Sequence, residues 1–437
     1  MLGIMLPTLI ISIVTFVLVT LSIIFFPSIK IGKVRLDTYW MVALLGAVIL
    51  IATSLAPMNE VLNQLVAPNS INPLKILILF FSMTILSIYL DEVGLFRYLA
   101  CLATKKAVKN QFGLFLVLYA LTSVLTLFTS NDVVILTLTP FICFFAKNAK
   151  INPLPFLIAE FAAANTWSMA LIIGNPTNIY LATSAGITFL GYLKVMIVPT
   201  LFAGLVEFSL ILLIFHKQLH QPIRIENEEY RIESHSDLVL GVSLLVVCLV
   251  LLTVSNYVHF EMWIVSAACA VSLLLGALIL RLVTKRHWNY LGDSFRRLPY
   301  PLIPFMLSMF VIVVALHTQG ISAALGEWLN RGNPIFVYGY ASFLASNVIN
   351  NIPMSILFSS LPQGLAEPLY RQAVYASVIG SNIGAFLTPI GALAGIMFSS
   401  LLHKYEVKYT FLDFTKYGAM IALPTITVAL LGLFLVL

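Results

Sequence analysis

Charge is the scarcest feature of this sequence. Only 10% of its 437 residues are Asp, Glu, Lys or Arg, whereas 60% are hydrophobic. A soluble globular domain carries about 25% charged residues. Apolar runs of roughly 17 to 25 residues recur from end to end, and each is long enough to cross the hydrocarbon core of a bilayer as a helix. The composition therefore excludes a soluble domain and predicts an all-α polytopic membrane protein.

Common catalytic motifs are also missing. The chain has no GxxxxGK[ST] motif, which argues against direct use of ATP, and no HExxH or GxSxG motif, which removes the simplest intramembrane hydrolases. Asp132 is the single Asp deep in an apolar run and lacks the second acid that an aspartyl protease requires. We therefore expect a protein that is not an enzyme and needs no cofactor.

Cysteine is scarce as well. The four cysteines fall in four separate predicted segments without CxxC spacing: Cys101, Cys143, Cys248 and Cys269. This scatter predicts neither a disulfide framework nor a metal site, so we expect buried packing residues.

The N-terminal 26 residues differ from a signal peptide. Their apolar core is longer, they have no basic n-region, and no small-x-small cleavage site precedes Lys30. We expect a retained first membrane helix.

Positive charge is concentrated in a few loops. Of the 24 Lys and Arg residues, 20 lie in six segments: 27–37, 91–110, 147–150, 216–236, 281–299 and 402–416. Cytoplasmic loops hold the excess of Lys and Arg, so these six are predicted to face the cytoplasm. The net charge of +6 is thus explained by membrane topology, and nucleic acid is not an expected partner.

The six loops share one side only if two segments return to the face they entered from. We predict re-entrant hairpins at 111–146 and, from the opposite face, at 335–361. Ten transmembrane helices remain: 4–26, 38–56, 74–90, 153–188, 192–215, 237–256, 259–280, 301–317, 371–399 and 414–437. This topology places both termini on the non-cytoplasmic side of the cell membrane.

The two halves of the chain resemble each other. FSMTILSIYLDEVG (81–94) aligns with LSMFVIVVALHTQG (307–320), with Ser-Met near the start and Gly at the end of each. Further on, the Ser-Asn pair at 130–131 is repeated at 346–347. By the charge count the two aligned helices run in opposite directions, so the repeats are predicted to be inverted.

A second pair of motifs supports the repeat. GNPTN (174–178) corresponds to LTPIG (387–391). The repeats define five predicted parts: 1–73, N-terminal scaffold helices; 74–215, repeat 1 with a broken helix at 153–188; 216–236, a cytoplasmic loop; 237–300, scaffold helices and a basic loop; and 301–437, repeat 2 with a broken helix at 371–399.

Inverted repeats are typical of secondary transporters, whose substrate site forms near mid-membrane where broken helices meet. Backbone that leaves helical geometry there must face protein or water. The predicted breaks carry hydroxyls and amides that can donate and accept hydrogen bonds. The expected substrate-binding residues are Ser130, Asn131, Asn175, Thr177, Asn178, Ser346, Asn347, Asn350, Asn351, Asn382 and Thr388.

Two acids are candidates for proton coupling. A charge at the bilayer centre costs roughly 2.5 to 3.5 kcal/mol, so Asp132 in FTSNDVVILTLTP is a functional hypothesis. It could also act as a helix N-cap, and the two roles can coexist. Glu160 could be a second proton carrier or the structural partner of a Ser or Thr hydroxyl. Glu207 is expected to be paired or interfacial.

The segment DEVGLFRYLACLATKK is amphipathic. Asp91 and Glu92 at its start suit a helix N-terminus, and the lysines at its end suit a helix C-terminus. We expect a helix lying on the cytoplasmic surface, between a span and the first hairpin.

Several of these segments are similar to a known family. SNDVVILTLTP, LDEVGLFRYLA, SNVINNIP and IGSNIGAFLTPIGALAG together resemble the ion transporter superfamily, and most closely its arsenite/antimonite efflux permeases, the ArsB family. The likeness covers most of the chain from about residue 38. Dicarboxylate relatives carry Ser-Asn-Thr at both hairpin tips. Here Asp132 replaces the first Thr, so an anion would meet a negative charge.

The resemblance implies export of neutral As(OH)3 or Sb(OH)3 in exchange for protons. Capture of arsenic by thiolates would need two or three converging cysteines, and the scatter of the four argues against it. A sodium/proton antiporter fits nearly as well, since an Asp beside Asn and Ser oxygens could exchange Na+ for H+. The sequence leaves open whether a soluble ATPase subunit binds, with 216–236 as its docking place, and whether the chain forms a homo-oligomer.

Overall fold

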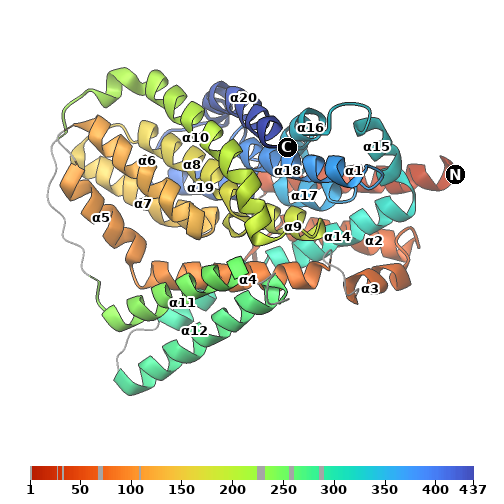
Figure 1. Cartoon of the computed structure of the whole chain (residues 1–437), viewed down its shortest axis with the longest axis horizontal. Helices are drawn as coiled ribbons and strands as arrows, with labels where there is room; N and C mark the ends of the chain where they lie inside the picture. Colours follow the sequence, from red (N-terminus) through yellow and green to blue (C-terminus); the bar gives the residue numbers. More distant parts are fainter. Residues whose placement is uncertain are drawn as a thin grey trace.

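The structure is a computed structural model that describes residues 2–26, 28–31, 34–66, 72–107, 110–223, 232–254, 260–284 and 290–437. Almost all of the described chain is helical (Figure 1), which confirms the predicted all-α class. Six of the basic loop residues lie outside the described residues: Lys33, Lys109, Arg224, Arg231, Lys285 and Arg286.

The first half of the chain contains ten α-helices and two short 3-10 helices in the described residues. They are α1 (Leu2–Phe25), α2 (Tyr39–Ala52), α3 (Met58–Val66), α4 (Pro73–Glu92), α5 (Leu95–Ala107), α6 (Gln111–Phe128), α7 (Asn131–Ala149), α8 (Leu154–Trp167), η1 (Ser168–Ala170), η2 (Ile172–Gly174), α9 (Pro176–Ser184) and α10 (Phe189–Leu219).

The second half contains ten more α-helices in its described part. They are α11 (His235–Val254), α12 (Met262–Thr284), α13 (Tyr290–Arg297), α14 (Leu302–Thr318), α15 (Ile321–Leu329), α16 (Pro334–Ile349), α17 (Asn351–Phe358), α18 (Glu367–Gly384), α19 (Leu393–Lys404) and α20 (Phe411–Val436).

Nine helical segments of the described chain are long and apolar enough to cross a membrane. Their outer faces carry large apolar side chains, as on α11, where Val239 is 65% exposed and Val250 is 56% exposed. Such surfaces are stable in lipid and unstable in water. The polytopic membrane class predicted from composition is therefore confirmed.

The helix breaks occur where the sequence predicted them. The first hairpin breaks at Thr129 and Ser130, which have extended backbones between α6 and α7. The second breaks at Asn350, whose φ of 69° lies in the left-handed region. The first broken helix consists of α8, η1, η2 and α9, and the second of α18, residues 385–392 and α19. Both α6 and α7 have the length of full spans, so re-entry stays a prediction.

The aligned helices α4 and α14 end in the same way. Each is followed by a glycine with positive φ, 89° at Gly94 and 76° at Gly320. The Gly94 amide donates to the Asp91 carbonyl, and the Gly320 amide donates to the His317 carbonyl. These are corresponding positions of the alignment, so the local structure is repeated along with the sequence. The opposite membrane orientation of the two helices stays a prediction.

The position of the two acids before α5 was predicted wrongly. Asp91 and Glu92 form the last turn of α4, and α5 begins only at Leu95, after the Gly94 turn. The acids therefore do not cap the amphipathic helix. The reason is tertiary, because both carboxylates bind the guanidinium of Arg297 on α13.

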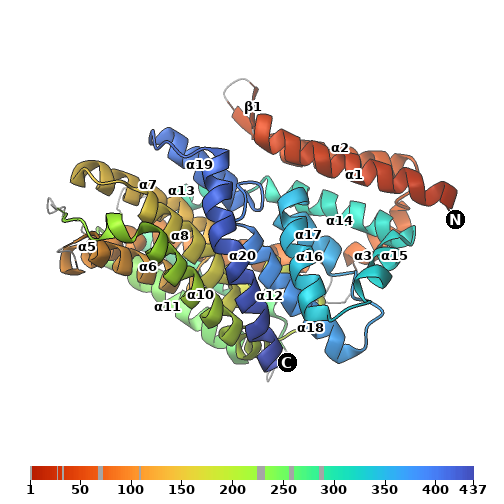
Figure 2. The ribbon, with the colours of Figure 1, turned by 90° about the horizontal axis from the view of Figure 1, so that it is seen from above.

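Three predicted loops contain regular structure. In the loop 27–37, β1 (Ser28–Ile31) pairs antiparallel with β2 (Val34–Asp37). Two others hold the short helices α13 and, after α14, α15. Figure 2 shows the N-terminal pair α1 and α2 along one edge of the molecule, where α2 packs on α14. The β-hairpin between them lies beside a cavity, and its last residue, Asp37, forms part of the cavity wall.

Candidate functional site

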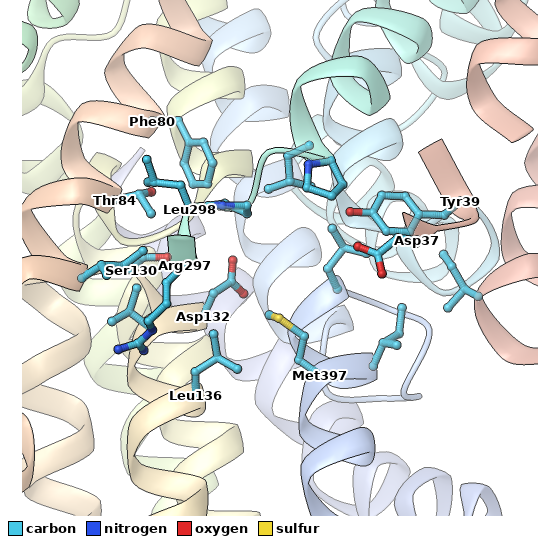
Figure 3. A pocket seen from close by; sticks show the side chains of 18 residues that line it. Asp37, Tyr39, Phe80, Thr84, Ser130, Asp132, Leu136, Arg297, Leu298 and Met397 are labelled. Carbon is cyan, nitrogen blue, oxygen red and sulfur yellow. The ribbon is translucent and has the colours of Figure 1, made fainter. Parts of the chain in front are cut away.

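A cavity of about 320 Å³ lies where six parts of the chain meet. Its wall is formed by α4, the first two turns of α7, the α13–α14 junction, α19, the β2–α2 junction and the end of α1 at Ile23. Figure 3 shows Asp132 in its middle, with Ser130 and Thr84 to one side and Asp37 and Tyr39 to the other. The cavity thus joins the first hairpin to the second broken helix.

Asp132 is held in the first turn of α7 and points into this cavity (Figure 3). Among the described residues, no side chain donates a hydrogen bond to its carboxylate or pairs with it. Ser130 is the N-cap of α7 but makes no side-chain capping bond. The N-terminal amides of α7 favour a negative charge here. A carboxylate that has no fixed partner is free to bind a proton or a solute.

Two buried hydroxyls beside Asp132 also lack a protein partner. They are the Oγ of Ser130 and the Oγ1 of Thr84 on α4. Buried polar atoms are normally hydrogen-bonded, so unpaired ones in a cavity wall mark places for water or a ligand. Ser130 was expected at the site, whereas Thr84 was missed. The alignment of 81–94 with 307–320 could have indicated it, because Thr84 is a polar residue in the first of these helices.

Asp37 is a second acid in the cavity wall that the sequence did not indicate. It ends β2, paired with Ser28, and its side chain is half-buried at the start of α2. Burial raises the pKa of Asp37 above its usual range, because desolvation disfavours the carboxylate. The cavity therefore holds two carboxyl groups from distant parts of the chain.

Arg297 is the cation in the described cavity wall, and its charge is already compensated. Its Nη1 lies 2.7 Å from the Oδ2 of Asp91 and 2.6 Å from the Oε1 of Glu92. The Asp91 side chain is only 7% exposed. Two acids on one guanidinium leave no free positive charge for an anion. Together with Asp132 and Asp37, they make the cavity acidic.

A network of buried amides connects the two broken helices. The Oδ1 of Asn382 accepts hydrogen bonds from Ser168 Oγ and Asn175 Nδ2, both at 3.1 Å. The Nδ2 of Asn382 donates to Asn178 Oδ1 at 2.6 Å. Thr177 Oγ1 donates to Asn175 Oδ1. Four of the predicted residues are thus brought together, and Ser168 joins them unpredicted.

The second hairpin is bonded to the second break. Thr388 Oγ1 donates to Asn347 Oδ1 at 2.7 Å, and Asn350 Nδ2 donates to the Ile390 carbonyl at 3.0 Å. The Asn351 amide donates to the Gly391 carbonyl. The hydroxyl of Ser346 instead bonds to Phe343 within its own helix. These residues therefore satisfy the backbone that the breaks expose.

Asn131 lies one step behind the cavity. Its Nδ2 donates to Asn165 Oδ1 on α8 at 3.0 Å, and its own Oδ1 has no protein partner. The predicted site residues therefore form three groups: Ser130 to Asp132 at the cavity, the amide network, and the second hairpin with its break. Of these residues, only Ser130 and Asp132 line the 320 Å³ cavity. Asn165 was missed because nothing in the sequence marks it within its helix.

Glu160 lies outside the cavity. Thr139 Oγ1 donates to its Oε2 at 2.9 Å, while its Oε1 has no protein partner. It thus has the hydroxyl partner that was one of its two expected roles. Glu207 on α10 is also fully buried, and it accepts a hydrogen bond from Thr166 Oγ1. Glu207 is paired, as expected.

All four cysteines are free and buried. Two of them, however, do converge, although they were expected to lie apart. Cys248 on α11 and Cys269 on α12 lie close to each other, and Cys248 Sγ lies 3.7 Å from Met83 Sδ. None of the three lines the acidic cavity. Within the described chain, no group of three or more His, Cys, Asp and Glu residues is arranged to hold a metal ion.

A polytopic helical protein with two broken helices joined by amides, and with an unpartnered acid in a cavity beside them, has the construction of a membrane transporter. The sequence model of the family described as citrate transporter, CitMHS, matches residues 37–376. The chain belongs to this family of membrane transporters, within the ion transporter superfamily.

Curated relatives carry more specific names. The chain is 29% identical to the arsenical pump membrane protein of Escherichia coli (strain K12) over 367 residues, which cover 81% of this chain and 84% of that protein. It is 27% identical to the arsenical pump membrane protein of Yersinia enterocolitica, with the same coverage. It is 23% identical to an uncharacterized transporter of Mycobacterium tuberculosis, covering 82% of this chain and 86% of that one.

One solved structure has a similar fold. The YdaH transporter of Alcanivorax borkumensis, whose crystal structure is described as having an unusual topology, superimposes with a TM-score of 0.50. The match covers 99% of this chain and 97% of that one at 12% sequence identity. At this identity the likeness concerns the fold alone.

Proposed function

We propose that this protein exports arsenite or antimonite, as neutral As(OH)3 or Sb(OH)3, in exchange for protons. The observation that carries the proposal is the carboxylate of Asp132, which faces a cavity without a protein partner. The names of the relatives, arsenical pump membrane proteins, support the substrate class.

The charge of the cavity favours a neutral or cationic solute. A multivalent anion such as citrate would meet Asp132 and Asp37, and the one nearby guanidinium is paired with Asp91 and Glu92. Two like charges about 4 Å apart repel by about 4 kcal/mol near a protein surface. A citrate substrate, suggested by the family description, is therefore disfavoured for this member.

A neutral trihydroxyl solute suits the groups in the cavity. Ser130 Oγ and Thr84 Oγ1 are free to accept or donate one hydrogen bond each to solute hydroxyls. The carboxylate of Asp132 can accept a further hydrogen bond while it is charged. When Asp132 binds a proton it loses much of its strength as an acceptor, so proton binding and solute release are coupled.

Alternating access is the mechanism we infer for this exchange. The hydrogen-bonded breaks of the two repeats would form the centre of the protein, and the hairpins would move against the scaffold around it. In this mechanism the Asn347–Thr388 pair has the same role in the second repeat as Asn131 and Asp132 have in the first. The amide network provides hydrogen bonds to the interrupted helices in both states.

A sodium/proton antiporter is the second candidate. The cavity's two carboxyl groups and the unpaired Asn131 Oδ1 could together supply oxygen ligands for Na+, although Asn131 is not itself in the cavity wall. This candidate uses the same residues and predicts the same proton release. It differs only in the partner ion.

Everted membrane vesicles separate the two candidates. A pH gradient with the acidic side inside the vesicles should drive accumulation of arsenite or antimonite. We expect this accumulation in vesicles that contain the protein and not in vesicles that lack it. Addition of Na+ should not release protons from the loaded vesicles. Sodium-dependent proton release without metalloid movement would instead favour the antiporter.

A further inference from the structure

A second cavity, of about 280 Å³, lies away from Asp132. It is lined by α14, the turn that follows α17, α9 and α3, and none of its lining residues lines the first cavity. Tyr180, Ser359 and Gln363 form part of its wall, with His317 where α14 ends.

The two cavities are built from corresponding parts of the two repeats. Each is lined by the aligned helix of one repeat, which is α4 in the first cavity and α14 in the second. Each is also lined at the second arm of that repeat's hairpin, by α7 in the first cavity and by the turn after α17 in the second, and by the second arm of the other repeat's broken helix, α19 or α9. A short helix that precedes the other repeat adds to each wall: α13 in the first and α3 in the second. The first cavity is lined in addition by α1 and the β2–α2 junction.

The correspondence extends to individual residues. Under the alignment of 81–94 with 307–320, Thr84 corresponds to Phe310 and Ile88 corresponds to Val314. Both members of each pair line their cavity. The two equivalent helices therefore line their cavities with the same face. If the repeats are inverted, as the loop charges predict, the two hollows open toward opposite sides of the membrane.

The chemistry of the second cavity differs from that of the first. Six of its nine lining residues are polar, yet none of them is Asp or Glu. Tyr180 and Ser359 are both buried in the wall. A polar cavity of this size holds water, whereas an apolar packing defect stays dry. It can solvate a small neutral solute and offers no strong site for a bare cation.

We propose that this second cavity is the other half of the transport route, opposite Asp132, and that a neutral hydroxylated solute passes through it in hydrogen bonds to Tyr180, Ser360 and Gln363. The inference rests on the proposed transport function and names its second aqueous half. The acid that exchanges the proton lies in only one of the two halves.

Cysteine labelling tests the route without reference to the substrate. Val313→Cys and Ser360→Cys place thiols in the second cavity, and Met397→Cys places one in the first. The native cysteines are buried, so the unsubstituted chain provides the background. Leu344→Cys, at a residue of α16 that is 59% exposed, serves as the lipid-facing control.

A membrane-impermeant thiol reagent is applied to right-side-out and to everted vesicles. We expect Val313→Cys and Ser360→Cys to react from one side only, Met397→Cys from the other side only, and Leu344→Cys from neither. Reaction of the second-cavity thiols from the same side as Met397→Cys would overturn the proposal. A complete lack of reaction at Val313→Cys would overturn it as well.

A blocking substitution tests whether solute uses the cavity. Val314→Trp fills the cavity, and Val348→Trp adds the same bulk on the outside of α16, where Val348 is 59% exposed. At equal protein in the membrane, we expect Val314→Trp to lower transport at least about tenfold and Val348→Trp to change it less than about twofold. A wild-type rate for Val314→Trp would remove the cavity from the route.

This failure is distinguishable from failure of the proposed function. If the transported species is Na+, arsenite movement is absent from the wild type, but the labelling pattern and the loss of sodium/proton exchange in Val314→Trp remain. If Val314→Trp is not recovered as folded protein, labelling of Val313→Cys, a substitution that removes little volume, decides the question.

Discussion

Asp132 combines three properties that few residues of a membrane protein share. It lies in an apolar run and in the first turn of a helix. Its carboxylate has no hydrogen-bond or ion-pair partner among the residues that the structure describes. Burying an acid without a partner costs free energy, so such a residue persists where its protonation is used. At the residue scale, the proposed coupling mechanism therefore rests on this side chain.

Replacement of Asp132 by Asn should remove proton coupling and leave the fold intact. The amide has the same shape and can still form hydrogen bonds, but it cannot gain or lose a proton. We expect uptake driven by a pH gradient to fall at least about tenfold in Asp132→Asn vesicles. Asp293→Asn, at an acid 44% exposed on α13, is the control. Wild-type transport by Asp132→Asn would remove Asp132 from the mechanism.

At neutral pH, the half-buried carboxylate of Asp37 should lower the stability of the folded protein. Burial raises its pKa, so the folded protein binds a proton more tightly than the unfolded chain does. Stability therefore rises as the pH falls through the folded-state pKa. We expect Asp37→Asn to raise the melting temperature in detergent at pH 7, and this gain to shrink at acidic pH. A lower melting temperature for Asp37→Asn at pH 7 would contradict the prediction.

At the element scale, Arg297 connects α13 to the end of α4. It also explains why Asp91 and Glu92 extend α4 instead of beginning α5. The sequence showed the acids and the arginine, but their pairing spans about 200 residues and depends on how α13 packs on α4. Local helix preferences predicted that both acids begin α5, whereas in the structure they end α4.

Loss of this link should destabilise the protein. Arg297→Gln leaves the 7% exposed Asp91 without its partner. Breaking a fully buried pair costs about 3 to 5 kcal/mol, and because Arg297 is 33% exposed we expect about 1 to 3 kcal/mol here. Thermal unfolding in detergent measures the change.

The neighbouring arginine supplies a matched control. Arg296 is 80% exposed and lies 3.5 Å from Asp293. Exposed pairs contribute little, so Arg296→Gln should cost less than about 0.5 kcal/mol. Equal effects of the two substitutions would show that the pairing with α4 is not what stabilises this region.

At the scale of the whole molecule, the sign of the cavity's charge should set which solutes pass. Asp132 on α7 and Asp37 after β2 come from parts of the chain that only the fold brings together. We expect citrate in about hundredfold excess to leave arsenite uptake unchanged, because a trivalent anion is repelled from this cavity. Competitive inhibition by citrate, measured in the same vesicles, would contradict this expectation.

The positions of the helix breaks could be predicted from the sequence. Gly, Pro, Asn and Ser in otherwise apolar runs interrupt helices because they expose or satisfy backbone groups, and Thr129, Asn350 and the segment before Pro176 do so here. Asp132 was identified for a related reason, since a charge in lipid is costly enough to be informative by itself.

The partners of these residues could not be predicted, because they depend on packing. Thr84, Asn165 and Ser168 look like ordinary polar residues of their helices, and Asp37 looks like a loop acid. The scattered cysteines were expected to stay apart, yet the packing of α11 on α12 joins Cys248 to Cys269. One-dimensional spacing holds no information on such neighbours.

The sequence by itself determined that this chain is a multi-span helical membrane protein with interrupted helices and a single Asp, Asp132, deep in an apolar run, because hydrophobicity, helix-breaking residues and buried charge can each be recognised locally in the sequence. Only the tertiary structure decided that Asp37 and Asp132 share a cavity, that Arg297 is paired with two acids, and that a second cavity has no acid in its wall. These facts depend on contacts between residues far apart in the chain, and such contacts arise only when the helices pack.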